Sequence, residues 1–298
     1  MPMNLDDKLV VGISSRALFD LEEENHIFET QGLRAYSEYQ RAHENDVLKP
    51  GTAFPLVKAL NNLKYGDEKL TEVIIMSHNQ ADTALRIFNS AEYYGLGISR
   101  AALTGGKSIT SYLKPFRTDL FLSANEADVQ AAVNAGFAAG LICKNTFPMD
   151  ENEEIGQIRI AFDADAVIFS DEAEQIYQTK GLEAFAEHER KNAEKPLPEG
   201  PFAKLLKTIS LVQQKFDEDN MPIRTALVTA RNAPAHERVV KTLRAWNVRI
   251  DESFFLGGVQ KSEILQAFGA HIFFDDQAVH LNSASSVVPS ARVPYKKK

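Results

Sequence analysis

The sequence predicts an α/β protein of two related lobes, each built on a parallel sheet covered by helices. Three observations lead to this prediction. The two halves of the chain resemble each other, apolar runs alternate with helical stretches in both, and a polar turn follows each apolar run. The 298 residues, 44% hydrophobic and 25% charged, are enough for two ordinary domains.

The internal repeat appears when residues 17–60 are set over residues 166–209 without gaps. Thirteen of the 44 positions are then identical, among them Gly32 with Gly181. Unrelated stretches of ordinary composition would share about three. After a shift of three residues in a connecting loop, the order of elements continues to match as far as the final strand of each half. We therefore expect an internal duplication.

The predicted boundary between the lobes falls near residue 150, in the acidic stretch MDENEE, giving lobes at 1–150 and 151–298. Strands that alternate with helices favour parallel pairing. In parallel sheets, ligands bind beyond the carboxyl ends of the strands, where both polar turns are expected. Residues 170–222, between the first two strands of the second lobe, have helical periodicity and are predicted to form a small helical cap.

The bulk composition excludes several classes of function. A formal charge of −8 and a pI near 5.5, with only a terminal KKK as a basic cluster, argue against nucleic-acid binding. The polar N-terminus is not a secretory signal, and no apolar run approaches the roughly 18 residues that span a bilayer. With Cys143 as the single cysteine, no internal disulfide forms. We expect a cytoplasmic protein.

Carboxylates follow the strands of the second lobe but not those of the first. They are Asp163, Asp165, Asp275 and Asp276, which the repeat sets over Ser14, Arg16, Ser123 and Ala124. Four acids that converge on one sheet edge repel one another unless a cation lies between them. Carboxylates and a phosphate oxygen are typical ligands of Mg²⁺. The sequence thus predicts Mg²⁺-dependent phosphate chemistry in the second lobe alone.

The order of the motifs resembles that of the haloacid dehalogenase (HAD) superfamily. The motifs are DADAV at 163–167, Thr229 in LVTA, Lys261 in GGVQKSEIL, and FFDDQ. The stretches GISSRALFDLEE, VTARNAP, HIFFDDQ and the terminal VPY further resemble the class I cytosolic 5′-nucleotidases and their bacterial relatives, from about Val10 to Tyr295. This resemblance implies HAD-like, Rossmann-type lobes and Mg²⁺-dependent hydrolysis of nucleoside 5′-monophosphates such as AMP.

The resemblance also implies roles for individual residues. Asp163 is the expected nucleophile, and Asp165 the acid that protonates the leaving 5′-oxygen and then activates water. Thr229 would hold the phosphate and Lys261 would neutralise the phosphoenzyme. The implied metal ligands are Asp163, Asp165 (through its backbone carbonyl), Asp275 and Asp276, with Asp275 favoured over Asp276 for direct contact.

Each of these residues also has a purely structural interpretation. Thr229 could cap a helix, and Lys261 could be a surface lysine. Arg231 would reach the substrate phosphate or base, or lie on the surface. In the first lobe, Ser14, Arg16, Ser77 and Lys107 form a predicted anion-binding edge that contacts nucleotide or substrate, the alternative being a degenerate repeat with no ligand.

The leading prediction is a 5′-nucleotidase that forms an aspartyl-phosphate intermediate. A phosphatase acting on a sugar phosphate, and a nucleotide sensor with vestigial catalysis, are the alternatives. The sequence leaves open the base preference, the effectors, homo-oligomerisation and the way in which the two lobes face each other.

Overall fold

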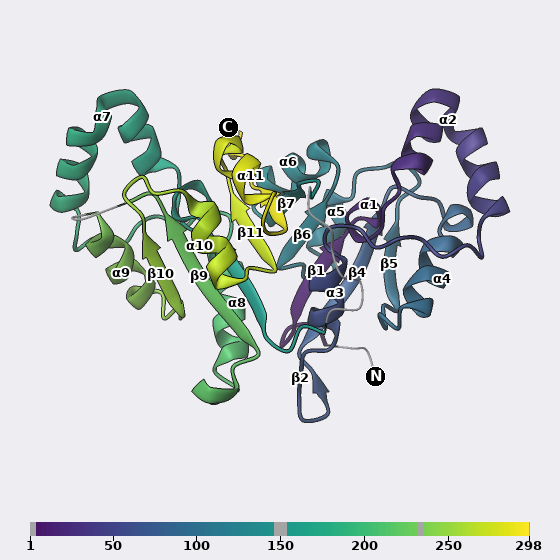
Figure 1. Ribbon diagram of the computed structural model, residues 1–298, viewed down its shortest axis with the longest axis horizontal. Coiled ribbons are helices and arrows are strands. Elements are labelled where there is room, and N and C mark those ends of the chain that lie inside the picture. The colour runs from purple at the N-terminus through teal and green to yellow at the C-terminus, as the bar shows by residue number, and fades with distance from the viewer. Residues whose placement is uncertain (1–3, 146–153, 232–234, 298) are drawn as a thin grey trace.

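The computed structural model describes residues 4–145, 154–231 and 235–297, which form one ten-stranded sheet with helices on both faces (Figure 1). The strand order is β10-β9-β8-β11-β12-β7-β6-β1-β4-β5. The first five of these strands come from residues 154–297, called here the C-terminal half, and the other five from residues 4–145, the N-terminal half. The predicted α/β class is confirmed.

The two halves contain a similar but not identical succession of elements, since among the described residues the N-terminal half has a hairpin that the C-terminal half lacks. The N-terminal half has β1 (Leu9–Ile13), α1 (Ser15–Leu18), α2 (Glu22–Ala42), α3 (Phe54–Asn61), the hairpin β2 (Lys64–Tyr65) and β3 (Glu68–Lys69), β4 (Thr71–Ser77), η1 (Ala81–Thr83), α4 (Leu85–Tyr93), β5 (Arg100–Leu103), α5 (Thr110–Leu113), β6 (Leu120–Ser123), α6 (Glu126–Asn134) and β7 (Ala138–Ile142). The C-terminal half has β8 (Ile158–Phe162), η2 (Ala164–Ile168), α7 (Glu172–Lys191), α8 (Ala203–Gln213), η3 (Glu218–Asn220), β9 (Ile223–Thr229), α9 (His236–Ala245), β10 (Glu252–Phe255), α10 (Lys261–Phe268), β11 (Ile272–Asp275), α11 (Ala278–Ala284) and β12 (Ser290–Arg292).

Within the ten-stranded sheet, the strands of each half are parallel, and the halves meet at one antiparallel pair. Ala291 of β12 lies opposite Ile142 of β7. Because of this pairing, the strands of the two halves run in opposite directions, and their carboxyl ends lie at opposite edges of the sheet. The predicted lobes are therefore two halves of a continuous sheet. Most of the predicted boundary stretch, residues 149–153, lies outside the described residues.

The hydrophobic core has one layer on one face of the sheet and two separate layers on the other. Alternate residues of β1 point to opposite faces: Val11 and Ile13 join one cluster and Val10 another. The first cluster is shared by both halves and includes α3, α4, α8 and α9. On the other face, α5 and α6 cover the N-terminal half, and α10 and α11 cover the C-terminal half.

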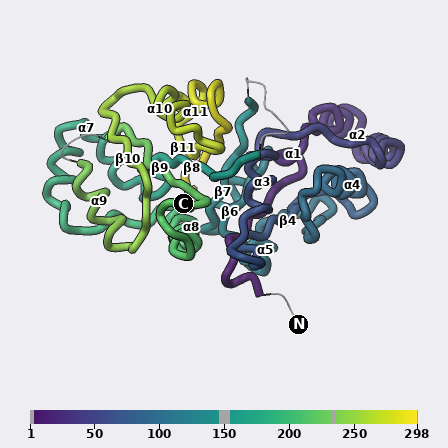
Figure 2. Tube along the Cα trace, turned by 60° about the horizontal axis from the view of Figure 1, so that its bottom comes forward, coloured from purple at the N-terminus to yellow at the C-terminus, as the bar shows by residue number. Residues whose placement is uncertain are grey.

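Two long helices, α2 and α7, stand away from the sheet at its two ends (Figures 1 and 2). Each is interrupted by a glycine with positive φ, Gly32 at 84° and Gly181 at 80°. Of the helices within the predicted cap, residues 170–222, only α7 stands away from the sheet (Figure 1). Helix α8 packs into the shared core, with Leu206 and Ile209 fully buried. The prediction that residues 170–222 form a cap is therefore contradicted for α8 and is not confirmed for the rest of the segment.

The turns after β1 and β8 differ by one residue. The carbonyl of Ser15 accepts a hydrogen bond from the N–H of Phe19, whereas that of Ala164 accepts one from Phe169, five residues on. The extra residue is accommodated where Ala166 has φ of 60°. The gap-free pairing of the two halves therefore does not hold residue by residue through this turn.

The ring of His271, beside the first residues of β8, makes stability depend on pH. Its Nδ1 accepts a hydrogen bond from the backbone N–H of Arg159 at 2.8 Å. Burial, together with the charge of Arg159, lowers the pKa of His271 from 6.5 to about 4. The folded protein holds a neutral ring, so this stabilisation is present above pH 6.5 and is lost as the pH falls towards 4.

We expect wild-type protein to lose about 1 to 2 kcal/mol more stability than His271→Asn between pH 7 and pH 5, a range reduced for solvent screening of the half-buried ring. Urea unfolding at the two pH values measures this difference. His26→Asn, on the exposed side of α2, is the control and should behave like wild type. An unchanged pH dependence in His271→Asn would contradict the assignment.

Candidate active site

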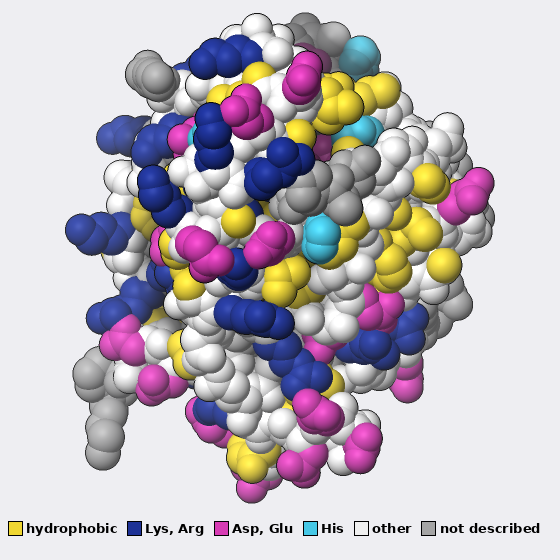
Figure 3. Space-filling model, turned by 90° about the vertical axis from the view of Figure 1, so that its left-hand side faces the viewer, with side chains coloured by type: hydrophobic (Ala, Val, Ile, Leu, Met, Phe, Trp, Pro, Cys, Tyr) yellow, Lys and Arg dark blue, Asp and Glu magenta, His cyan; other side chains and the backbone are white. Residues whose placement is uncertain are grey.

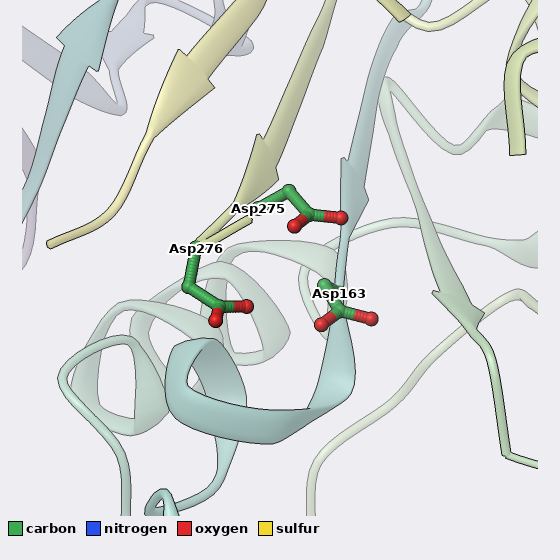
Figure 4. Close-up of side chains that lie close together, drawn as sticks. All are labelled: Asp163, Asp275 and Asp276. Carbon is green, nitrogen blue, oxygen red and sulfur yellow. The ribbon is translucent and has the colours of Figure 1, made fainter. Parts of the chain in front are cut away.

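Three carboxylates converge at the carboxyl edge of the C-terminal half. Asp163 directly follows β8, Asp275 is the last residue of β11, and Asp276 follows it. β8 and β11 are neighbours, and the strand order reverses between them, because β9 lies on the other side of β8. This is the point where open α/β sheets bind ligands. The three side chains point toward a common space (Figure 4).

The cluster is buried and carries an unfavourable concentration of charge. One oxygen from each carboxylate lies within 4.8 Å of the other two. Asp163, Asp275 and Asp276 are 5%, 0% and 7% exposed. Burial, together with the charges of the neighbouring carboxylates, raises the pKa of Asp163 to about 6 and that of Asp276 to about 8. A cation at this point would remove the repulsion.

Lys261, the first residue of α10, supplies one positive charge. Its Nζ donates to Oδ1 of Asp163 and to Oδ2 of Asp275, each at 2.7 Å. Burial lowers the pKa of Lys261, but the charges of these two carboxylates outweigh it and the net shift is upward. At 4% exposure Lys261 is not a surface lysine. Lys261 therefore contacts two of the three carboxylates directly.

The two aspartates of FFDDQ have different surroundings. Both oxygens of Asp275 are engaged, since Oδ1 accepts from the N–H of Gln277 and Oδ2 from Lys261 and from Nδ1 of His280. Burial raises the pKa of Asp275, but these hydrogen bonds and the Lys261 charge lower it overall. Asp276 accepts from the hydroxyl of Tyr295, and its Oδ1 is buried without a partner among the described residues.

Tyr295 reaches Asp276 from the segment after β12, which is held against the N-terminal half. Gln130 of α6 donates to the carbonyl of Tyr295 at 2.9 Å, and Asn134 of α6 accepts from the N–H of Lys297 at 2.9 Å. Burial, followed by the hydrogen bond to Asp276, raises the pKa of Tyr295. Thus a helix of one half supports the side chain that contacts the acidic cluster of the other.

Asp165 does not join the cluster through its side chain. Its carboxylate accepts two hydrogen bonds from Arg231, from Nε at 2.8 Å and from Nη2 at 2.5 Å. Arg231 is 5% exposed, which excludes the surface interpretation. Its Nη1 donates to Glu189 of α7 at 2.6 Å, and Glu189 also accepts from Arg238 of α9 at 2.9 Å.

Two members of this buried network, Glu189 and Arg238, were not predicted from the sequence. Burial alone would raise the pKa of Glu189, but the charge of Arg231 reverses the shift and the pKa is lowered. A buried glutamate between two arginines fixes the position of the guanidinium that holds Asp165. The sequence signal was weak, because Glu189 lies in a highly charged helical stretch, EHERK.

Thr229, the last residue of β9, is 1% exposed, and its hydroxyl accepts a hydrogen bond from the N–H of Arg231 at 3.2 Å. It therefore lies at the same sheet edge as the acids. The four residues predicted in the N-terminal half lie at the opposite edge. Ser14 and Ser77 are buried with their hydroxyls bonded within the half, Arg16 pairs with Glu22, and Lys107 is exposed in the Gly105-Gly106 turn.

A buried acidic cluster with a lysine at the carboxyl edge of a parallel sheet is typical of enzymes that act on phosphate esters. Comparison with known proteins agrees with this class. A family model described as 5′-nucleotidase matches residues 1–298, and the chain belongs to that family.

Among curated proteins, the human "Cytosolic 5'-nucleotidase 1B" is 39% identical over 309 aligned positions. The alignment covers 100% of this chain and 50% of the human protein, so the chain spans about half the length of that relative. No solved structure matches the chain. The family predicted from the motifs is confirmed.

The hydrophobicity of the helices and the charge of the surface are relevant to the kinds of partner that this protein can bind. Within the described residues, no helix is both long enough and apolar enough to cross a membrane. Figure 3 shows the face that carries α7 and α9, on which lysine and arginine side chains are interspersed with aspartate and glutamate. Such a mixed face differs from the basic surface of a typical nucleic-acid-binding protein.

The Glu189 network yields a stability prediction. Glu189→Ala leaves Arg238 without its carboxylate and Arg231 with only Asp165, so we expect the free energy of unfolding to fall by about 3 to 5 kcal/mol. Chemical denaturation measures the loss. Glu187→Ala is the matched control on the same helix, because Glu187 is exposed and pairs only with Lys191. Equal stability of the two variants would exclude a structural role for the network.

Proposed function

We propose that this protein is a Mg²⁺-dependent 5′-nucleotidase that hydrolyses nucleoside 5′-monophosphates of the AMP type to nucleoside and phosphate. The observation that carries the proposal is the contact of Lys261 with both Asp163 and Asp275, beside Asp276, in a chain of the 5′-nucleotidase family. The name of the human relative supports the same activity and a cytoplasmic location.

The residues present fit a magnesium ion. Three carboxylates offer oxygen ligands within 4.8 Å of one another, and the Oδ1 of Asp276 has no partner among the described residues. Hard oxygen donors of this kind suit Mg²⁺. Asp163 and Asp276 would hold the ion directly. The engaged oxygens of Asp275 favour Asp276 over Asp275 as the direct ligand, the reverse of the preference drawn from sequence.

The bound ion would neutralise charge on the phosphate oxygens. In the proposed first step, a carboxylate oxygen of Asp163 attacks the phosphorus in line with the departing 5′-oxygen. The phosphorus–oxygen ester bond breaks, and an aspartyl-phosphate forms. Lys261 would stabilise the added negative charge, and the hydroxyl of Thr229 would hold a phosphate oxygen.

Proton transfer is assigned to Asp165. The departing 5′-oxygen takes a proton from its carboxyl group, and the resulting carboxylate then removes a proton from the water that attacks the phosphorus of the aspartyl-phosphate. Inorganic phosphate leaves and the Asp163 carboxylate is restored. Because Arg231 holds both oxygens of Asp165 in this structure, the nucleotide has to draw Asp165 away from Arg231 before the first transfer.

The activity is tested by phosphate release from nucleoside 5′-monophosphates and sugar phosphates, with Mg²⁺ and with a chelator. We expect release from AMP-type substrates with Mg²⁺, abolished by the chelator and reduced about 10³-fold or more by Asp163→Asn, since the nucleophile is lost. Asp219→Asn, at an exposed position in η3, should stay close to wild type. Release from sugar phosphates alone would reject the nucleotide substrate while retaining the mechanism.

The role of Asp165 is tested by the choice of leaving group. For AMP, whose alkoxide leaves poorly, we expect Asp165→Asn to lower kcat by about 10² to 10⁴. For p-nitrophenyl phosphate, whose leaving group needs no acid, release of nitrophenol in the first turnover should fall only about tenfold, because the later step in which Asp165 acts as base is common to both substrates. First-turnover losses of equal size for the two substrates would mean that Asp165 is not the acid.

A further inference from the structure

The carboxyl edge of the N-terminal half contains a cavity of about 900 Å³ that the proposed hydrolysis does not use. This N-terminal cavity is bounded by Arg16 of α1, residues 49–52, Tyr93 and Tyr94 at the end of α4, Ala124 after β6, and residues 142–145 at the end of β7. It lies where the strand order reverses, since β6 is on one side of β1 and β4 on the other. The acidic cluster occupies the corresponding point of the C-terminal half.

The two places where the strand order reverses, one in each half, carry side chains of different chemistry. The described residues of the N-terminal half contain no cluster of potential metal ligands, and serines end β4 and β6. A phosphate ester bound in the N-terminal cavity would therefore meet neither a nucleophilic aspartate after β1 nor carboxylates that hold a metal. Binding there would not lead to hydrolysis by the mechanism proposed for the other edge.

The cavity has an excess of positive charge in a chain whose formal charge is −8. Arg16, Lys49 and Lys144 line it, against Asp20 and Glu22. Glu22 takes one nitrogen of Arg16 at 3.1 Å. The Nε of Arg16 is buried and has no acceptor among the residues that the structure describes. An anionic oxygen would satisfy that donor, and the two exposed lysines would add charge.

The cavity also presents an aromatic surface. Tyr93 is 71% exposed, unusually open for a large ring, and its ring lies 5.1 Å from that of Tyr94. A planar base packs well on such a ring. We propose that the N-terminal cavity binds a nucleoside phosphate, with the phosphate against Arg16 and Lys49 and the base against Tyr93, and does not hydrolyse it.

Binding at this site needs no metal, so it is measured by calorimetry on the full chain with AMP in the presence of a chelator, which separates it from any turnover. We expect saturable binding that Arg16→Gln/Lys49→Gln weakens about tenfold or more, through loss of charge-assisted contacts. Lys49→Gln alone, at an exposed position, should weaken it in the same direction without a folding defect. Arg34→Gln, on α2 and 92% exposed, should bind like wild type.

The location is tested with 8-azido-AMP under the same conditions, followed by peptide mapping. Photolabelling of the peptide that contains Tyr93 and Tyr94 would support the site, and competition by AMP but not by equimolar inorganic phosphate would support the contact with the base. Labelling confined to the C-terminal half, or affinity unchanged in Arg16→Gln/Lys49→Gln, would overturn the proposal. Neither result depends on whether the C-terminal half hydrolyses nucleotides.

Discussion

The placement of three carboxylates at one buried point is the constraint on which the active half depends. Burial and the neighbouring carboxylates disfavour Asp163 and Asp276 as anions, and Lys261 compensates only part of the repulsion. Other groups at this edge of the sheet hold two of the carboxylates in place. His280 and the N–H of Gln277 fix Asp275, while Tyr295 fixes Asp276 and leaves one oxygen open toward the centre.

A second set of buried charges lies next to the first but is fully paired. Arg231 stands between Asp165 and Glu189, and Arg238 completes the set. Because Glu189 belongs to α7 and Asp165 to the turn after β8, the network joins the helix of the C-terminal half that stands away from the sheet to a residue close to Asp163 in the chain. A movement of α7 would therefore shift Asp165, because Arg231 is hydrogen-bonded to both Glu189 and Asp165.

Much of this arrangement could be predicted from the sequence, because strand-end acids after apolar runs have few structural uses. The class of fold and the convergence of Asp163, Asp275 and Asp276 follow from that reasoning. The single continuous sheet did not follow, since one antiparallel pair between short strands leaves little trace in composition. Nor did Glu189, because a charged residue on a charged helix looks exposed until the neighbouring elements are known.

The contact of Tyr295 with both α6 and Asp276 has a consequence for how the chain can be divided. An isolated C-terminal half would lose the helix that anchors its last segment, and with it the hydroxyl beside Asp276. It would also expose the face of α8 that packs in the shared core. The N-terminal half thus acts as a scaffold for the acidic cluster. The integrity of the C-terminal half therefore depends on the N-terminal half, whatever ligands the N-terminal half binds.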